Sequence, residues 1–183
     1  MRKTKLYIIM AGFIILMAGA GWFYSTQSQK TKTPDISQED REPVLAVDFN
    51  VQNAEGKNTY LSDFYDGKPI VLNFWASPCR PCQLEMPDFM DLYQEYQEDV
   101  HFVMIDCIGS LGETKEKGMA FLKENNYTFP VYFDVNQNAV TNYGVMSFPT
   151  TYIFNGKQEL YAGGTGMIDP DKVRTFLDRL LDE

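Results

Sequence analysis

A pair of cysteines follows directly after a long apolar run in the segment KPIVLNFWASPCRPCQLEMP. The run Ile70–Trp75 indicates a strand that is buried on both faces, as strands between two layers of helices are. After the cysteines, apolar residues recur at helical spacing as far as Tyr96. Strand, turn and helix in this order predict an α/β sheet, with the cysteines at the carboxyl end of a buried strand, where such sheets place their sites.

The rest of the chain adds strands and helices on both sides of this unit. Alternating runs around Ala54–Lys57 predict an N-terminal β-hairpin, and VHFVMIDC and FPVYFD predict further strands. Helices are expected over about residues 114–126, within NQNAVTNYGV, and after Asp169-Pro170, which supplies a cap and a first-turn proline. TTYIFNGKQELYAGG predicts a second hairpin, with the positive φ of its turn at Asn155-Gly156. The predicted fold class is therefore α/β, a central mixed sheet flanked by helices.

The N-terminal segment is unusually apolar. Leu6–Tyr24 is almost wholly hydrophobic and follows Arg2, Lys3 and Lys5. As a helix it would be about 28 Å long, close to the thickness of a bilayer core. We therefore expect residues 1–24 to form a single transmembrane anchor with a cytoplasmic N-terminus. A cleaved signal peptide, with Ala18-Gly19-Ala20 as its cleavage site, is the alternative.

Composition divides the remainder into a tether and a domain. Residues 25–42 are polar and without apolar periodicity, which indicates a flexible tether, and residues 43–183 form one domain. With either reading of the N-terminus the domain lies on the extracytoplasmic side of the cell membrane, where thiols tend to oxidise. The chain carries 16 Lys/Arg against 25 Asp/Glu, a net charge of −9, which is unsuited to binding nucleic acid.

Cys79 and Cys82 have the spacing of a redox pair. At the start of a helix, free N–H groups and the helix dipole lower a thiol pKa from about 8.5, and Arg80 adds a positive charge. Cys82 is three residues further on and can reach the Cys79 sulfur in a small ring. Cys79 is therefore expected to attack disulfides, and Cys82 to resolve the mixed disulfide.

Two other uses of the pair remain open at this point. Zinc needs about four ligands, and besides the pair the chain offers only Cys107 and His101, which lie six residues apart in a strand-like run. A purely structural disulfide usually closes a longer loop. Redox use is favoured, with no metal and no cofactor expected.

Longer motifs carry a family resemblance. FWASPCRPC resembles the active-site segment of the thioredoxin superfamily, and CRPCQLEMP matches the C-x-P-C-x-x-E-x-P pattern of its TlpA/ResA-like branch. LSDFYDGKPIVLNFW and FPTTYIFNGKQELYAGGTG also match, so the resemblance covers about Pro43–Glu183. It implies a thioredoxin-like fold and a membrane-anchored, extracytoplasmic thiol-disulfide oxidoreductase.

The resemblance also implies catalytic residues besides the cysteines. Glu85 matches the acidic position of the branch; a partly buried carboxylate there would have a raised pKa and could take the proton of Cys82. Thioredoxins have aspartate at the strand position that Asn73 occupies here, so Glu85 is the local candidate for this role. Cys79, Cys82 and Glu85 form the expected catalytic set.

Substrate contacts are implied by the same resemblance. The Phe148-Pro149 bond is expected to be cis, with Pro149 facing the cysteines and the Phe148 backbone free to pair with an extended client segment. Pro78 stands where the branch normally has tryptophan. Pro78, Trp75 and Arg80 complete the expected substrate-binding residues.

Cys107 ends the second parallel strand, at the sheet edge of the active site. It is either a buried small hydrophobe or a third redox residue.

The function that the resemblance implies is reductive. Pro81 before the second cysteine is typical of reducing members. Expected partners are disulfide-containing clients, such as apocytochromes c or methionine sulfoxide reductases, and a membrane thiol carrier of the CcdA/DsbD type as electron donor. We expect a monomer. Two alternatives are a peroxiredoxin-like peroxidase, whose nucleophile has Thr or Ser three residues upstream where this chain has Ala76, and a non-catalytic client-binding module.

Overall fold

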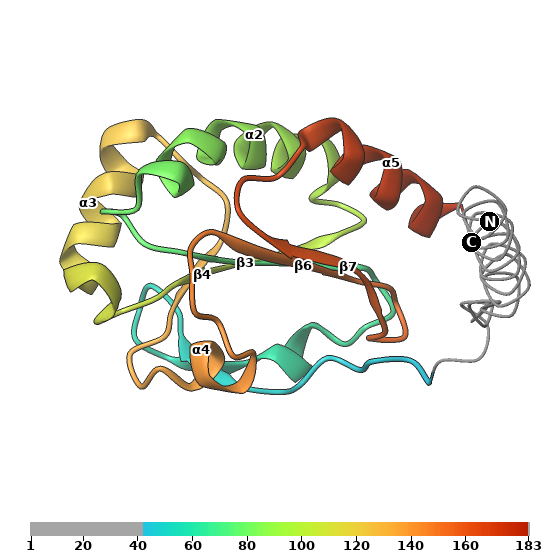
Figure 1. Cartoon of the computed structure of the whole chain (residues 1–183), viewed down its shortest axis with the longest axis horizontal. Coiled ribbons are helices and arrows are strands. Elements are labelled where there is room, and N and C mark those ends of the chain that lie inside the picture. Colours follow the sequence, from blue (N-terminus) through green and yellow to red (C-terminus); the bar gives the residue numbers. More distant parts are fainter. Residues whose placement is uncertain (1–41, 183) are drawn as a thin grey trace, which may run out of the picture. The chain divides into compact units, whose positions relative to one another are not determined.

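Helices cover a single mixed sheet in the computed structural model, which describes residues 42–182 (Figure 1). The described part of the chain contains seven strands, in the spatial order β2-β1-β5-β4-β3-β6-β7. They are β1 (Asn50–Gln52), β2 (Asn58–Tyr60), β3 (Ile70–Trp75), β4 (His101–Asp106), β5 (Val131–Phe133), β6 (Thr150–Phe154) and β7 (Leu160–Thr165).

The strand that precedes the cysteines lies in the middle of this sheet. β3 pairs in parallel with β4 and antiparallel with β6, and every one of its residues is buried. β4 and β5 continue the parallel part, while β1–β2 and β6–β7 are antiparallel hairpins at the two edges. The predicted mixed sheet with a buried central strand is confirmed.

Helices lie on both faces of the sheet (Figure 1). α2, α3 and α5 cover one face, and α4 lies on the other. Two short 3₁₀ helices, Leu61–Phe64 and Ser110–Gly112, connect elements. The α-helices are α2 (Arg80–Tyr96), α3 (Lys115–Asn125), α4 (Asn138–Asn142) and α5 (Pro170–Leu181).

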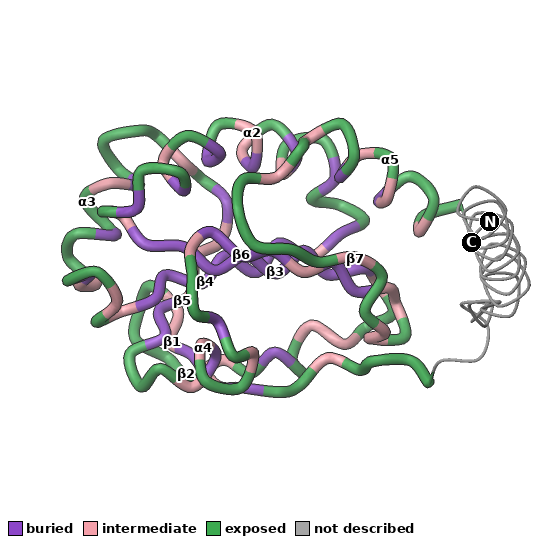
Figure 2. The backbone as a smooth tube through the Cα atoms, viewed as in Figure 1, coloured by how far each residue is buried: buried purple, intermediate pink, exposed green. Residues whose placement is uncertain are grey.

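The side chains of β3 point alternately to the two faces of the sheet, and the core is accordingly divided into two hydrophobic clusters, one on each face. Val71 and Trp75 belong to the cluster under α2, α3 and α5, whereas Leu72 and Phe74 belong to the cluster on the α4 side. Figure 2 shows the buried backbone concentrated in the central strands between the two layers. Asn73 is on the same side as Val71 and Trp75 because side chains alternate along a strand, so it faces α2.

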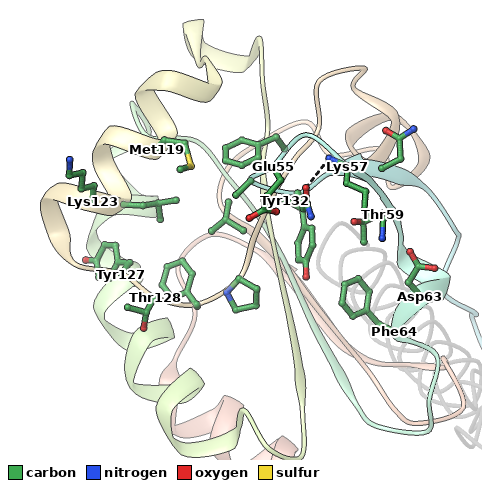
Figure 3. Close-up of a pocket in the computed structure, with 18 of the residues that line it drawn as sticks. Glu55, Lys57, Thr59, Asp63, Phe64, Met119, Lys123, Tyr127, Thr128 and Tyr132 are labelled. Carbon is green, nitrogen blue, oxygen red and sulfur yellow. Dashed lines mark hydrogen bonds between the residues drawn. The ribbon is translucent and has the colours of Figure 1, made fainter.

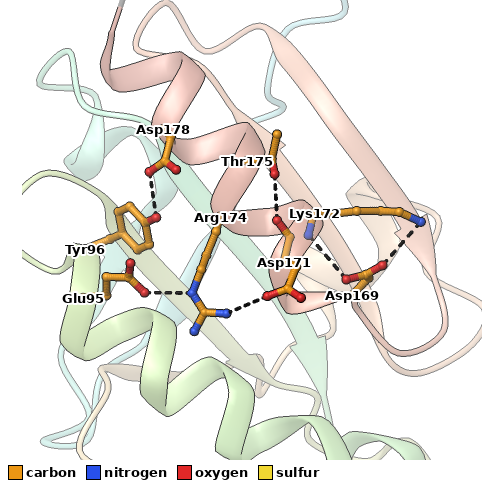
Figure 4. Close-up of polar contacts among 8 residues, drawn as sticks. All are labelled: Glu95, Tyr96, Asp169, Asp171, Lys172, Arg174, Thr175 and Asp178. Carbon is orange, nitrogen blue, oxygen red and sulfur yellow. Dashed lines mark hydrogen bonds and ion pairs between the residues drawn. The ribbon is translucent and has the colours of Figure 1, made fainter.

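α5 is capped as its sequence predicts, and it is held against α2. The Asp169 side chain accepts a hydrogen bond from Lys172 N at 3.4 Å and so caps the helix. Tyr96 Oη on α2 donates to Asp178 Oδ1 at 2.8 Å, as Figure 4 shows. Gly166 N–H donates to the Pro149 carbonyl at 2.8 Å, and this bond places the loop before α5 next to the start of β6.

The β6–β7 turn differs from its prediction. Its left-handed residue is Gln158, with φ 64°, and Gly156 is not among the residues with positive φ. Gly156 is needed for another reason, because a Cβ there would lie 2.1 Å from the Gly67 carbonyl oxygen. The turn is therefore longer than two residues, and its glycine permits close packing against the turn that precedes β3.

The predicted anchor at 1–24 and nearly all of the predicted tether lie outside the described residues. Over residues 42–182, no helix combines the length and the apolar character needed to cross a membrane.

Candidate active site

The cysteine pair forms a disulfide at the N-terminus of α2. Cys79 is the N-cap residue, and its Sγ accepts a hydrogen bond from Cys82 N at 3.2 Å. The two Cα atoms are 5.3 Å apart, and Cys79 is 5% exposed whereas Cys82 is fully buried. The Cys79 sulfur therefore takes the place of a capping oxygen at the positive end of the helix, a position that favours a thiolate.

Glu85 lies on the buried stripe of α2 together with Cys82 and Met86. Its side chain is fully buried, and its two oxygens accept hydrogen bonds from Asn73 Nδ2 at 3.1 Å and from Ile168 N at 3.0 Å. Burial raises the pKa of Glu85 to about 7; the two hydrogen bonds oppose this rise, and the charge of Asp88 adds to it. A carboxyl group with such a pKa can accept or release a proton near neutral pH.

Asn73 links Glu85 to β6. Its Nδ2 donates both to Glu85 and to Thr151 Oγ1, the latter at 3.0 Å, and Thr151 is its register partner across the sheet. Asn73 Oδ1 is buried and has no hydrogen-bond partner among the described residues.

The Phe148-Pro149 bond is cis, as expected. It precedes β6, whose first residue Thr150 pairs with Phe74 near the carboxyl end of β3, so the proline lies at the same end of the sheet as the cysteine turn. The Pro149 carbonyl accepts from Gly166 N at 2.8 Å, while the Phe148 N–H and carbonyl have no hydrogen-bond partner within residues 42–182. The Phe148 side chain packs against the cluster that contains both cysteines.

The other predicted substrate contacts divide into two groups. Pro78 and Arg80 are exposed beside Cys79, and Arg80 Nη1 donates to Gln83 Oε1 at 3.2 Å. Trp75 is fully buried and packs against Phe121 of α3, with ring centroids 5.8 Å apart. The expectation that Trp75 touches a client is therefore corrected: as the last residue of a strand covered by α3, its side chain belongs to the core.

Two buried acidic residues near the cysteine turn were not predicted. Glu113 is 2% exposed and accepts hydrogen bonds from Ser77 N and from Thr114 N, so it braces the turn that carries Cys79. Asp106 is fully buried at the end of β4, and neither of its carboxylate oxygens has a partner in the described part of the chain. Burial, and then the charge of Glu113, raise the pKa of Asp106 to about 8. The sequence feature that could have identified Asp106 is its position as an aspartate at the end of a buried strand.

Cys107 is buried and free. Its N–H donates to the Trp75 carbonyl at 2.9 Å, and burial raises the pKa of its thiol well above the usual value. It begins the loop after β4, whereas His101 is the first residue of that strand. The strand therefore separates the two residues that the zinc alternative would have required together, and residues 42–182 contain no cluster of three metal-binding side chains.

Two cavities lie near the sheet. The larger, of about 1200 Å³, lies between the β1–β2 hairpin, β5 and α3, and Tyr127, Tyr132 and Lys123 are among its lining residues (Figure 3). It contains none of the predicted site residues. The smaller, of about 450 Å³, lies between β6, β7 and α5 and is lined in part by Thr151 and Ile168, the two outer members of the Glu85 network.

Comparison with known proteins agrees with this geometry. The sequence profile of the AhpC/TSA family matches residues 44–162. The chain belongs to the AhpC/TSA family. This member is 32% identical to the thiol-disulfide oxidoreductase ResA of Bacillus cereus, over 98% of this chain and 99% of that protein. It is also 32% identical to the thioredoxin-like protein YneN of Bacillus subtilis, over 84% of this chain and 89% of that one.

Solved structures show the same fold. StoA of Bacillus subtilis superposes with a TM-score of 0.62 at 25% identity, over 74% of this chain and 98% of that one. The exposed lipoprotein thioredoxin Etrx1 of Streptococcus pneumoniae gives a TM-score of 0.64 at 29% identity, over 73% of this chain and 99% of that one. The fold is thioredoxin-like, and this AhpC/TSA member is a thiol-disulfide oxidoreductase of the ResA type. The peroxidase alternative is not favoured, because these relatives are named oxidoreductases or thioredoxins.

Proposed function

We propose that the protein reduces disulfides of client proteins on the extracytoplasmic side of the cell membrane, with residues 1–24 as its anchor. The observation that carries the exchange chemistry is the position of Glu85. It shares the buried stripe of α2 with the inner cysteine, Cys82, and its pKa is about 7. A proton acceptor beside the less exposed sulfur is what a resolving cysteine requires.

The first half of the proposed reaction occurs at Cys79. In the reduced protein its thiolate, held at the helix N-terminus, attacks one sulfur of a client disulfide. A mixed disulfide forms between Cys79 and the client, and the other client sulfur leaves as a thiolate that takes a proton from solvent.

The second half releases the client. Cys82 gives its proton to Glu85, and the resulting thiolate attacks the Cys79 sulfur. The Cys79–Cys82 disulfide forms, and the second client sulfur leaves and is protonated. The client gains two electrons and two protons, and the protein is left in the oxidised form seen here.

Client docking is proposed at the surface around Cys79. The Phe148 N–H and carbonyl, which have no hydrogen-bond partner within residues 42–182, can pair with an extended client segment as an added strand, next to Pro149. Pro78 and Arg80 flank Cys79 in the sequence and are exposed. Together they would orient a client disulfide toward Cys79.

The proposed location and partners rest on the N-terminal sequence and on relatives. Etrx1 is described as an exposed lipoprotein, which supports an extracytoplasmic site for this chain as well. The proposed clients are apocytochromes c or secreted methionine sulfoxide reductases. Re-reduction of the Cys79–Cys82 disulfide would come from a membrane thiol carrier of the CcdA/DsbD type.

Trapping tests the cysteine roles. Cys82→Ser should accumulate a mixed disulfide with a client in intact cells, because the resolving step is lost, whereas Cys79→Ser should form none. Non-reducing electrophoresis followed by mass spectrometry identifies the trapped protein. Equal trapping by both variants would contradict the assignment, and retained function in the Cys79/Cys82 double Ser variant would favour the client-binding module.

Equilibration with glutathione tests the direction of electron flow. A reductant should have a potential near that of thioredoxin, about −270 mV, and a value near that of DsbA, about −120 mV, would overturn the reductive assignment. Peroxide consumption by the reduced protein tests the peroxidase alternative, and we expect none above the background of a Cys79→Ser control.

A further inference from the structure

The polar groups around Glu85 form a small buried network that joins three parts of the fold. Asn73 on β3 donates to Glu85 Oε1 at 3.1 Å and to Thr151 Oγ1 on β6 at 3.0 Å. Ile168, in the loop before α5, donates its N–H to Glu85 Oε2 at 3.0 Å. Asn73 and Glu85 are fully buried, and Thr151 is 5% exposed.

Asn73 Oδ1 is the one amide atom outside this network. It is buried without a hydrogen-bond partner among residues 42–182. A 180° rotation of the amide would therefore break no bond at Oδ1. It would exchange both Nδ2 bonds for two bonds accepted by Oδ1, one from a protonated Glu85 and one from the Thr151 hydroxyl, since a hydroxyl can donate as well as accept.

We propose that Asn73 is a positioning residue whose amide holds Glu85 in both protonation states, with Nδ2 donating to the carboxylate and Oδ1 accepting from the carboxylic acid. Because the amide has both a donor and an acceptor, the carboxyl group keeps a partner before and after it takes a proton. Neither a leucine nor a permanently ionised aspartate at this position could do this. The inference rests on the proposed role of Glu85 in the release of the client.

The hydrogen bonds to Glu85 affect how readily it takes and releases a proton. The ionised form of a fully buried carboxyl group is disfavoured unless hydrogen bonds satisfy it. Asn73 and Ile168 supply these bonds, and both lower the pKa that burial raises. Asp88, one turn further along α2, is the charged group that opposes them. Removing the Asn73 donor leaves Ile168 alone to stabilise the carboxylate.

The network is tested by titrating Glu85 in the full-length oxidised protein. Carboxyl carbon NMR on protein with labelled glutamate gives the midpoint, and the signal is assigned by its absence in Glu85→Gln. Asn73→Leu keeps the approximate shape of the side chain and removes the amide. It should raise the midpoint by about one pH unit, because the bond that Nδ2 donates to the ionised carboxylate is stronger than the bond that Oδ1 accepts from the neutral acid. Thr151→Val should raise it by roughly half as much, because the amide loses the Thr151 Oγ1 acceptor that holds Nδ2 toward Glu85.

Thr150→Val is the matched control. Thr150 neighbours Thr151 on β6 and is similarly buried, but its hydroxyl bonds to Ser147 O and Thr165 Oγ1 rather than to the network. The Glu85 titration midpoint in Thr150→Val should equal that in the unmodified protein. If Asn73→Leu does not fold, the comparison of Thr151→Val with Thr150→Val decides alone. An unchanged midpoint in Thr151→Val, or equal shifts in all variants, would overturn the positioning role.

A kinetic measurement separates this inference from the function on which it rests. The pH profile of client release from the mixed disulfide should move upward in Asn73→Leu in parallel with the Glu85 midpoint. A profile that is unaffected by Glu85→Gln would overturn the catalytic role of Glu85 and, with it, any role of Asn73 in the reaction. A profile that responds to Glu85→Gln but not to Asn73→Leu would overturn the inference about Asn73 alone.

Discussion

Two buried carboxyl groups near the active site have opposite surroundings. Glu85 accepts hydrogen bonds from Asn73 and Ile168, whereas Asp106 has none within the described residues. Both pKa values are raised by burial, to about 7 for Glu85 and about 8 for Asp106. Glu85 is therefore held where it can exchange a proton, while Asp106 is expected to stay protonated at neutral pH and to weaken the fold when it ionises.

Asp106 makes the stability of the protein depend on pH. Its folded pKa lies above the unfolded value, so between about pH 4 and pH 8 the folded state binds one more proton, and stability falls as pH rises. The expected slope is about 1.4 kcal/mol of unfolding free energy per pH unit. Asp106→Asn should remove this contribution, which urea unfolding at pH 5.5, 7 and 8.5 measures.

Glu85 also makes the stability fall as pH rises, up to about pH 7. Asp106→Asn should therefore reduce the slope of stability against pH rather than abolish it. Glu85→Gln is the matched control, and its effect should end about one pH unit earlier. A slope between pH 7 and 8 that Asp106→Asn does not change would show that Asp106 is not protonated in the folded protein.

At the scale of elements, α5 is held to α2 by contacts of different kinds (Figure 4). Tyr96 is 7% exposed, and its hydroxyl donates to Asp178 in a partly buried hydrogen bond. Arg174 bonds to Glu95 at 2.8 Å, but their side chains are 32% and 48% exposed. Solvent weakens such an ion pair, and the buried apolar residues Val173 and Leu177 hold the helix in place.

Removal of each polar contact should therefore have unequal effects. Tyr96→Phe should lower the free energy of unfolding by about 1 kcal/mol, because the Asp178 carboxylate loses its donor. Glu95→Gln, which removes the charge facing Arg174, should cost less than about 0.5 kcal/mol. Urea unfolding with unchanged m-values measures both, and a larger loss for Glu95→Gln would contradict this ranking.

The β6–β7 turn offers a test of close packing between turns. Gly156→Ala would place a Cβ 2.1 Å from the Gly67 carbonyl oxygen, and backbone must move to relieve the clash. We expect the free energy of unfolding to fall by about 1–3 kcal/mol. Gly164→Ala on β7 is the matched control, since its Cβ would have nothing within 4 Å. Equal unfolding midpoints for the two variants would show that the turns do not constrain each other.

At the scale of the whole molecule, the sheet order brings the site together. β3 lies between β4 and β6, so the cysteine turn after β3, Asp106 at the end of β4 and Pro149 before β6 meet at one end of the sheet. The described domain contains all of these residues. The disulfide chemistry is therefore expected to need residues 43–183 and not the segment before them.

A chain that begins at Pro43 tests this division. It should fold with the same unfolding midpoint as the full chain, reduce a model disulfide at the same rate, and move from the membrane fraction to the soluble fraction. Urea unfolding, an insulin reduction assay and fractionation measure these three properties. A truncated protein that stays with the membrane would contradict the predicted anchor, and one that fails to fold would contradict the predicted domain boundary.

The unit that carries the chemistry can be predicted from the sequence. The apolar run of β3, the Cys79–Cys82 spacing and the helical pattern of α2 are local signals, and local signals suffice to place a sulfur at a helix N-terminus. The family motif added the cis Phe148-Pro149 bond and the inward position of Glu85, and the structure has both.

The hydrogen-bond partners of these groups depend on the tertiary fold, which brings distant parts of the chain together. Asn73 meets Thr151 across 78 residues of sequence, and Glu85 meets Ile168 across 83. The burial of Trp75 under α3 and the absence of a partner for Asp106 within residues 42–182 depend on how separate elements pack. Periodicity reports which face of an element is buried, but hydrogen bonding and desolvation depend on what arrives from elsewhere in the chain, and these set the pKa values at the site.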